Sequence, residues 1–322
     1  MGRWSAIRLS GREDRGVKTR ALVVPALLAA LAGCGGGHGA ATQSTAAKPG
    51  AGKQPIRLAT KNFTEQFILG QLYAQALDAK GYRVELKNNV GTSEIVDRVL
   101  TGGGVDMYAE YTGVIVQELA KQSRRPRSAE ETYRRARAFE RTRGVVIFKH
   151  SPGQNVLANG VLPSFAHKHG LKSTADLKKL KSFTYGGPPE NLTRFQGLVG
   201  MRKVYGLTQA KYVPLKIEDR YPGLDSGKAQ VVGVFTTDGA LAQKGKYVVL
   251  TDPAGIFGFQ NIVPVVRRTV AEREGPVFEA TLNAVTAKLT NEELQKMNAA
   301  VDIQKKRPAD VARSFLEVNG LL

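Results

Sequence analysis

Polar side chains gather directly after a short apolar run near the start of the chain's main body. Residues 56–60 have the composition of a buried strand, and residues 64–80 have apolar side chains at helical spacing. In open α/β sheets, ligands bind where a strand ends and a helix begins, and the helix dipole there favours an anionic group. Lys61 is therefore a candidate partner for a ligand carboxylate. The structural alternative is that Asn62 caps the helix with Glu65 completing a capping box, while Lys61 lies in solvent.

A second cluster, Glu110–Gly113, follows the strand predicted at residues 105–108. A tyrosine at this position, Tyr111, is expected to point into the same crevice as Lys61. The face of a tyrosine ring attracts a cation with about 0.5–2 kcal/mol, depending on how fully the cation is desolvated. The alternative is that Tyr111 is a half-buried residue of the core.

Enzymatic motifs are missing from the sequence. It contains no G-x-S-x-G elbow, no H-E-x-x-H helix and no P-loop. Asp106 and Glu110 are not singled out as an acid pair by their spacing. The candidate metal ligands among the histidines are His150, His167 and His169. His167 and His169 flank a lysine in a polar, loop-like stretch, which favours solvated side chains over a metal site. We therefore predict neither an enzyme nor a cofactor or metal site.

Strands and helices alternate along the chain, which predicts parallel sheets covered by helices on both faces. The expected strands are residues 56–60, 82–87, 105–108, 183–185, 231–235, 248–250 and 263–266. The expected helices are residues 64–80, 93–101, 113–121, 174–180, 194–205, 277–289, 291–301 and 308–319. Thr290 and Pro308 are suited to begin the last two helices. About 270 residues remain after the N-terminal region, enough for two lobes of ordinary domain size.

The N-terminal segment resembles the signal of a bacterial lipoprotein. A basic stretch is followed by an apolar run, residues 21–32, that is too short to span a bilayer. The run ends in Leu-Ala-Gly-Cys, which is similar to a lipobox and implies cleavage before Cys34 and lipidation of its thiol. The alternative is a chance run of small residues with a buried cysteine. We expect residues 1–34 to be a signal peptide and residues 35–55 to be a flexible tether.

The chain carries a formal net charge of +19, which raises the question of nucleic-acid binding. The densest basic cluster, residues 124–143, alternates with Glu130, Glu131 and Glu140, as on a solvated helix face. No zinc-finger, RNA-binding or basic-zipper motif accompanies it. We therefore predict no nucleic-acid partner.

An ordered series of motifs resembles the glycine betaine/choline/carnitine-type substrate-binding proteins of osmoprotectant ABC transporters. The matching segments are Lys61–Gln66, Ile68–Gly70, Tyr108–Gly113, Gly186–Glu190 with Arg194 and Gly197, Tyr205–Leu207, Thr236–Gly239, Met297–Asn298, Val311–Ala312 and Phe315–Leu316. The resemblance covers Ile56 to Leu322. It implies the class II periplasmic-binding-protein fold, in which two α/β lobes joined by a double hinge crossover close around a ligand.

The resemblance also implies the chain's organisation and partners. Lobe one is expected to comprise residues 56–157 and 260–322, and lobe two residues 158–259, with crossings near Asn155–Gly160 and Gly258–Val263. The implied function is delivery of a quaternary-ammonium osmolyte to an ABC permease and its ATPase complex. The protein is expected to be a monomer, anchored by lipid at the outer face of the cytoplasmic membrane.

In this family an ammonium head group is held by a cage of aromatic rings. Tyr111 matches one cage position, Tyr221 falls where the other lobe supplies a second, and Lys61 matches a position that meets a ligand carboxylate in some members. The candidate ligand-binding residues are Lys61, Asn62, Phe63, Thr64, Asp97, Tyr111, Thr112, Asn155, Glu190, Arg194, Tyr221, Thr236, Asp238 and Asn261. The chain departs from the family where Asp97 replaces a cage tyrosine of some relatives, at Asn191 and Leu192, and along Phe257–Asn261. These departures leave open a non-ammonium solute such as a polyol, a glycoside or an amino acid.

Overall fold

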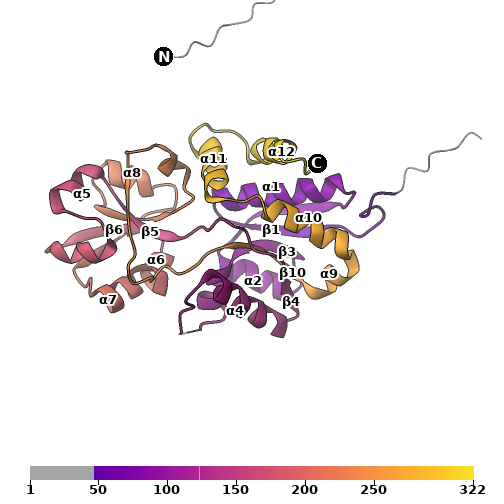
Figure 1. The fold of residues 1–322 in the computed structure, drawn as a ribbon, viewed down its shortest axis with the longest axis horizontal. Coiled ribbons are helices and arrows are strands. Elements are labelled where there is room, and N and C mark those ends of the chain that lie inside the picture. The colour runs from indigo at the N-terminus through magenta and orange to yellow at the C-terminus, as the bar shows by residue number, and fades with distance from the viewer. Residues whose placement is uncertain (1–46, 123) are drawn as a thin grey trace, which may run out of the picture. The chain divides into compact units, whose positions relative to one another are not determined.

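The computed structural model describes residues 47–122 and 124–322, and its strands form two separate five-stranded sheets (Figure 1). The order in the first sheet is β2-β1-β3-β10-β4. Its strands are β1 (Ile56–Lys61), β2 (Val84–Gly91), β3 (Met107–Tyr111), β4 (Val145–Ile147) and β10 (Ile262–Arg267). The order in the second sheet is β7-β6-β8-β5-β9. Its strands are β5 (Leu157–Val161), β6 (Phe183–Gly187), β7 (Ala210–Pro214), β8 (Val231–Phe235) and β9 (Val248–Leu250). The predicted two-lobed α/β architecture is confirmed.

The expectation of wholly parallel sheets is wrong for one strand in each sheet. β10 runs antiparallel to β3 and β4, and β5 runs antiparallel to β8 and β9. The other pairings are parallel, as strand–helix–strand units require. β5 and β10 differ because each is the first strand that the chain forms after arriving from the other sheet, so no helical crossover within its own sheet sets its direction.

Helices cover both faces of each sheet because the strands bury side chains on both faces. In the first sheet, Ile56 and Leu58 of β1 pack in one hydrophobic cluster, while Ala59 packs in another on the opposite face. Figure 1 shows α1 and α10 on one side of this sheet and α2 and α4 on the other. The α-helices are α1 (Thr64–Ala79), α2 (Ser93–Thr101), α3 (Thr112–Val114), α4 (Ala129–Thr142), α5 (Pro163–His169), α6 (Glu190–Thr193), α7 (Gly200–Tyr205), α8 (Arg220–Asp225), α9 (Arg268–Glu274), α10 (Pro276–Thr286), α11 (Asn291–Asp302) and α12 (Pro308–Val318).

Shorter helical segments complete the connections. They are the π-helical η1 (Ile115–Leu119) and η3 (Phe195–Val199) and the 3-10 helices η2 (Thr174–Lys179) and η4 (Gly239–Ala242). The helix expected at residues 113–121 is thus α3 followed by η1. Among the described residues, no helix combines the length and apolar character that crossing a membrane requires.

The capping predictions had different outcomes. Thr290 begins α11, and its side chain accepts a hydrogen bond from the Glu293 N–H at 3.2 Å, as expected. Pro308 occupies the first turn of α12. The prediction for α1 was wrong, since Phe63 precedes that helix without a side-chain capping bond. Asn62 is not the cap, and it lines the cavity described below.

The chain passes between the sheets twice, and the two passages run side by side. Gln154 and Asn261 form an isolated antiparallel bridge, and the Asn155 N–H donates to the Gln260 carbonyl at 3.0 Å. The Asn261 amide also donates to the Ser151 carbonyl at 2.9 Å. These paired segments form the double crossover that the resemblance implied, and two of their residues, Asn155 and Gln260, line the cavity described below.

Candidate ligand-binding site

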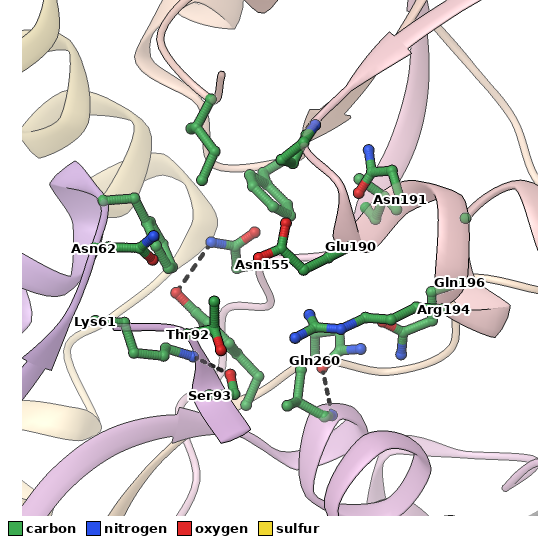
Figure 2. A pocket seen from close by; sticks show the side chains of 18 residues that line it. Lys61, Asn62, Thr92, Ser93, Asn155, Glu190, Asn191, Arg194, Gln196 and Gln260 are labelled. Atoms are coloured by element: carbon green, nitrogen blue, oxygen red, sulfur yellow. Dashed lines mark hydrogen bonds between the residues drawn. The ribbon is translucent and has the colours of Figure 1, made fainter. Parts of the chain in front are cut away.

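A cavity lies between the two sheets and is lined by residues from both (Figure 2). The first sheet's side contributes Lys61, Asn62, Phe63, Thr92, Ser93, Tyr111 and Val114. The crossing segments contribute Asn155 and Gln260, and the second sheet's side contributes Leu157, Pro188, Glu190, Asn191, Arg194, Gln196, Gly197, Ile217 and Phe235. β1 and β3 are adjacent and parallel, so their carboxyl ends bring residues 61–63 and Tyr111 to the same edge.

Lys61 is buried at this edge rather than solvated, which rules out that part of the structural alternative. Its ammonium forms an ion pair with the Glu110 carboxylate, contacts the Ser93 hydroxyl at 3.2 Å and lies 4.2 Å from the centre of the Tyr111 ring. Burial lowers the pKa of Lys61, and the charge of Glu110 opposes that shift. The negative charge of Glu110 therefore offsets the cost of burying the Lys61 ammonium, and these contacts hold the ammonium beside the cavity.

Tyr111 belongs both to the core and to the cavity wall. It is 5% exposed and packs in the main hydrophobic cluster of the first lobe, yet it also lines the cavity. Its hydroxyl donates to Glu65 at 2.7 Å and accepts hydrogen bonds from Gln66 and Asn155, each at 3.2 Å. Burial, with the Glu65 charge next in size, raises the pKa of Tyr111 well above its ordinary value. The hydroxyl is thus neutral, and three hydrogen bonds position it.

Three aromatic rings form a row across the cleft. The Tyr111 and Phe63 rings are stacked with centres 6.4 Å apart, and Phe63 stacks on Phe235 of the second sheet at 6.1 Å. The interplanar angle is 22° in both pairs. Phe235 is the last residue of β8, so each lobe brings an aromatic side chain to the carboxyl end of a strand. The row supplies an apolar, π-rich wall.

Charged residues of the second lobe also face the cavity, and Arg194 joins the lobes directly. Its guanidinium pairs with Glu94 at 2.5 Å and lies 3.8 Å from Glu118, both in the first lobe. In Figure 2 the side chains of Arg194 and Glu190 extend towards the middle of the pocket. The Glu190 carboxylate forms no ion pair with any of the described residues. Within the described part of the chain, the site therefore contains two cationic groups, Lys61 and Arg194, and one carboxylate, Glu190, without a cationic partner.

Three of the predicted residues line an adjoining pocket instead. Thr64, Tyr221 and Asp238 lie there, on the far side of Phe63 and Phe235, which border both pockets. The Tyr221 hydroxyl donates to Asp238 at 2.9 Å, and Asp238 also pairs with Arg220 at 3.1 Å. Tyr221 is consequently not brought together with Tyr111.

Four further predicted residues line neither pocket: Asp97, Thr112, Thr236 and Asn261. Asp97 lies one turn further along α2 than Ser93, and it pairs with Arg143 instead of lining the cavity. The Thr112 hydroxyl donates to the Phe259 carbonyl at 3.4 Å. Thr236 and Asn261 hold the crossing segments, through the Gln154 carbonyl at 2.9 Å and the Ser151 carbonyl at 2.9 Å respectively.

Several lining residues were not predicted: Thr92, Ser93, Asn191, Gln196, Phe235 and Gln260. Phe235 was recognisable in principle, because it ends a strand whose bounds the apolar pattern identifies. Thr92 and Ser93 begin α2, so a helix N-terminus next to a strand end was the available signal. Gln196 and Gln260 carried no such signal, since their positions depend on η3 and on the second crossing.

Comparison with known proteins gives consistent results. Residues 54–318 match the family described as the substrate binding domain of ABC-type glycine betaine transport systems. A glycine-betaine-binding protein of Pseudomonas aeruginosa is 30% identical over 284 residues, which cover 84% of this chain and 89% of the relative. The glycine betaine-binding protein YehZ of Escherichia coli is 28% identical over 279 residues, covering 83% and 91% of the two chains.

Among solved structures, one described as a glycine betaine/carnitine/choline ABC transporter superposes with a TM-score of 0.69. Its sequence identity is 24%, and the match covers 83% of this chain and 99% of that one. The fold likeness agrees with the two-sheet architecture, and the family match covers both sheets and both crossings. The chain belongs to the family of substrate binding domains of ABC-type glycine betaine transport systems.

Proposed function

We propose that this protein captures a quaternary-ammonium zwitterion of the glycine betaine or carnitine type, or choline, and delivers it to an ABC importer by closing its lobes around it. The observation that carries the proposal is the charge arrangement of the cavity. Lys61 and Arg194 provide positive charge, and Glu190 provides a carboxylate that forms no ion pair with the described residues. Phe63 and Phe235 provide aromatic rings, and the Arg220 guanidinium lies 4.8 Å from the centre of the Phe235 ring.

A zwitterion with a carboxylate and a trimethylammonium group matches this arrangement. The Lys61 ammonium has three donors, of which Glu110 and Ser93 engage two, so one remains for a ligand carboxylate. A trimethylammonium group has no N–H to donate, so it is stabilised by ring faces and by a nearby negative charge. In our proposal the carboxylate lies towards Lys61 and Arg194, and the ammonium lies between the phenylalanine rings and Glu190.

Lobe closure is supported by contacts that already join the two sides of the cavity. Arg194 reaches Glu94 at 2.5 Å, and the Gln196 amide donates to Gln117 at 2.6 Å. The aromatic pair Phe63 and Phe235 also has one ring from each lobe. A ligand that touches both walls would hold these contacts together and thereby stabilise the shape that a permease recognises.

Calorimetric titration tests the ligand class. We expect the Cys34-free mature chain to bind glycine betaine, carnitine or choline with a dissociation constant well below 1 mM. Sorbitol, an aryl glucoside and proline represent the alternative solutes. Tight binding of one of these, with none of the three ammonium compounds bound, contradicts the proposal.

Two rings of the second lobe are candidates for contact with the ligand's ammonium group: Phe235, which lines the cavity, and Tyr221, which the family resemblance implied. Replacing each ring with leucine decides between them. We expect Phe235→Leu to weaken glycine betaine binding by about tenfold, because a desolvated cation–ring contact contributes ~1–2 kcal/mol. Tyr221→Leu serves as the matched variant, and we expect less than a twofold change. Calorimetry on both proteins gives the comparison; the reverse order of effects would instead make Tyr221 the second cage ring.

Our proposal for the organisation of the chain places residues 56–157 and 260–322 in lobe one and residues 158–259 in lobe two. Residues 35–46 would form a tether to the outer face of the cytoplasmic membrane, and the protein would act as a monomer. The end of the expected 35–55 tether contacts the first lobe, where the Gly50 N–H donates to the Lys80 carbonyl at 3.0 Å and Lys53 pairs with Glu274 at 3.5 Å. Residues 1–46, including Cys34, lie outside the described residues. The proposed anchor rests on the lipobox-like Leu-Ala-Gly-Cys at 31–34.

Substituting Cys34 with serine tests this anchor. In a bacterial host we expect the wild-type protein to be recovered with membranes and to incorporate labelled palmitate. Cys34→Ser should lose the label and leave the membrane fraction, because the thiol that carries the lipid is absent. Ser44→Ala, in the proposed tether, is the control. Equal labelling of wild type and Cys34→Ser contradicts the anchor.

A further inference from the structure

Glu65 is a buried carboxylate in the first turn of α1, and donors from three separate parts of the fold hold it. The Tyr111 hydroxyl and the Asn155 amide each donate to its Oε1 at 2.7 Å. The Asn298 amide donates to its Oε2 at 2.9 Å. Glu65 is 3% exposed, and it forms no ion pair with any cation of the described residues. Its compensation thus comes from these hydrogen bonds.

The three donors lie in parts of the molecule that must move together when the lobes close: the cavity wall, the crossing segments, and α11 where it contacts the second lobe. Tyr111 ends β3 and lines the cavity. Asn155 lies on the first crossing, and its N–H donates to the Gln260 carbonyl of the second crossing at 3.0 Å. Asn298 lies on α11, and its amide also donates to the Thr237 carbonyl, just after β8 of the second sheet, at 2.8 Å.

We propose that Glu65 is a positioning residue that couples the Tyr111 ring at the cavity to the hinge and to the second lobe. The proposal rests on lobe closure around a ligand as the protein's function. A buried carboxylate that loses one of its donors leaves part of its charge uncompensated, which is costly. Movement of the Tyr111 ring therefore favours a matching movement of Asn155 and Asn298. A role in helix capping alone does not account for these contacts, because Phe63 is the N-cap and makes no side-chain capping bond.

Glu65→Gln tests this coupling. Glutamine offers one acceptor oxygen and one donor group, so it satisfies either the Tyr111–Asn155 side or the Asn298 side while a donor faces a donor on the other. Cys34 is the chain's one cysteine, so spin labels can be placed cleanly at Lys168→Cys and Glu279→Cys in a Cys34→Ser background. Both label positions are exposed, one on α5 beside the second sheet and one on α10 beside the first.

Pulsed electron–electron double resonance measures the distance between the two spin labels. Without ligand, Glu65→Gln should show a longer mean distance and a broader distribution than the wild-type protein. At saturating glycine betaine the closed fraction should fall to less than half of the wild-type value, with at least tenfold weaker affinity. Glu85→Gln, an exposed carboxylate on β2, is the control and should match wild type. A role that is only structural lowers the melting temperature but leaves the closed fraction at saturation unchanged.

A double-mutant cycle locates the coupling. In a Tyr111→Phe background the hydroxyl is gone, so Glu65→Gln should weaken binding less than threefold further. Asn298→Ser, which removes the contact with α11, is the second variant and should lengthen the label distance as Glu65→Gln does. Wild-type distances in both folded variants, with and without ligand, overturn the proposal for Glu65. Failure of the wild-type protein to bind any of the three ammonium compounds instead overturns the ligand assignment, and the ligand-free distances still decide the role of Glu65.

Discussion

Lys61→Met is expected to lower the free energy of unfolding by about 3–5 kcal/mol, the range found when one partner of a buried ion pair is removed. The Lys61 side chain is 3% exposed and that of Glu110 is fully buried, so the variant leaves the Glu110 carboxylate without its cation. One oxygen of Glu110 has no hydrogen-bond partner among the described residues even in the wild-type protein, which leaves little to replace the lost ammonium. Urea unfolding followed by circular dichroism measures the loss.

The double variant Lys61→Met with Glu110→Gln is the control for this effect. Because it removes both charges, we expect it to recover at least half of the lost stability. Glycine betaine binding should stay weak in both variants, since the donor proposed for the ligand carboxylate is absent from each. A single variant as stable as wild type would show that Lys61 and Glu110 do not depend on one another.

In the wild-type protein, titration of Glu140 is expected to lower the free energy of unfolding by about 3 kcal/mol as the pH rises. Glu140→Gln is expected to remove this pH-dependent loss. Glu140 is fully buried on α4, and burial raises its pKa from 4.5 to about 7. The charges that face it are Arg143 on the next turn of its own chain segment, Asp97 on α2 and Glu110 on β3, with the Tyr108 hydroxyl beside them. Arg143 opposes the upward pKa shift, while the two acids add to it.

The direction of the effect follows from the raised pKa. The Glu140 carboxyl binds a proton more tightly in the folded state than in the unfolded state. Its contribution to the free energy of unfolding is therefore fully present below pH 4.5 and is lost as the pH rises through about 7. Relative to wild type, Glu140→Gln should therefore gain stability between pH 5 and pH 8. Urea unfolding at those two values measures it, with Glu130→Gln as the control because that carboxylate is 61% exposed on the same helix. Parallel pH curves for wild type and Glu140→Gln contradict a raised pKa for this carboxyl.

The strands that could be predicted from the sequence are those with uninterrupted apolar runs. Residues 231–235 and 248–250 form β8 and β9 with the predicted bounds. β5 was missed because its sequence, Leu-Ala-Asn-Gly-Val, contains residues that strands generally disfavour. The fold tolerates Asn159 there because its buried amide donates to Thr174 at 3.0 Å. That partner lies 15 positions away and is not visible in a local pattern.

The candidate site could be predicted where it depends on strand ends and not where it depends on partners distant in the sequence. Lys61 and Tyr111 were identified because parallel strands end at a common edge. Asp97 was placed in the cavity by resemblance, but Arg143, 46 positions away, pairs with it. Tyr221 likewise turns to Asp238, and Phe235 supplies the ring of the second lobe at the cavity.

The measurement that tests the central claim most directly compares glycine betaine with 3,3-dimethylbutanoate. The two molecules share a carboxylate and a shape, but the second has a neutral carbon in place of the ammonium nitrogen. If Glu190 and the faces of Phe63 and Phe235 recognise the cation, calorimetry should show glycine betaine binding at least tenfold more tightly, as ~1–2 kcal/mol per desolvated ring contact implies. Equal affinity for the two compounds would mean that the cavity recognises shape and carboxylate alone, and would contradict a site built for a quaternary ammonium.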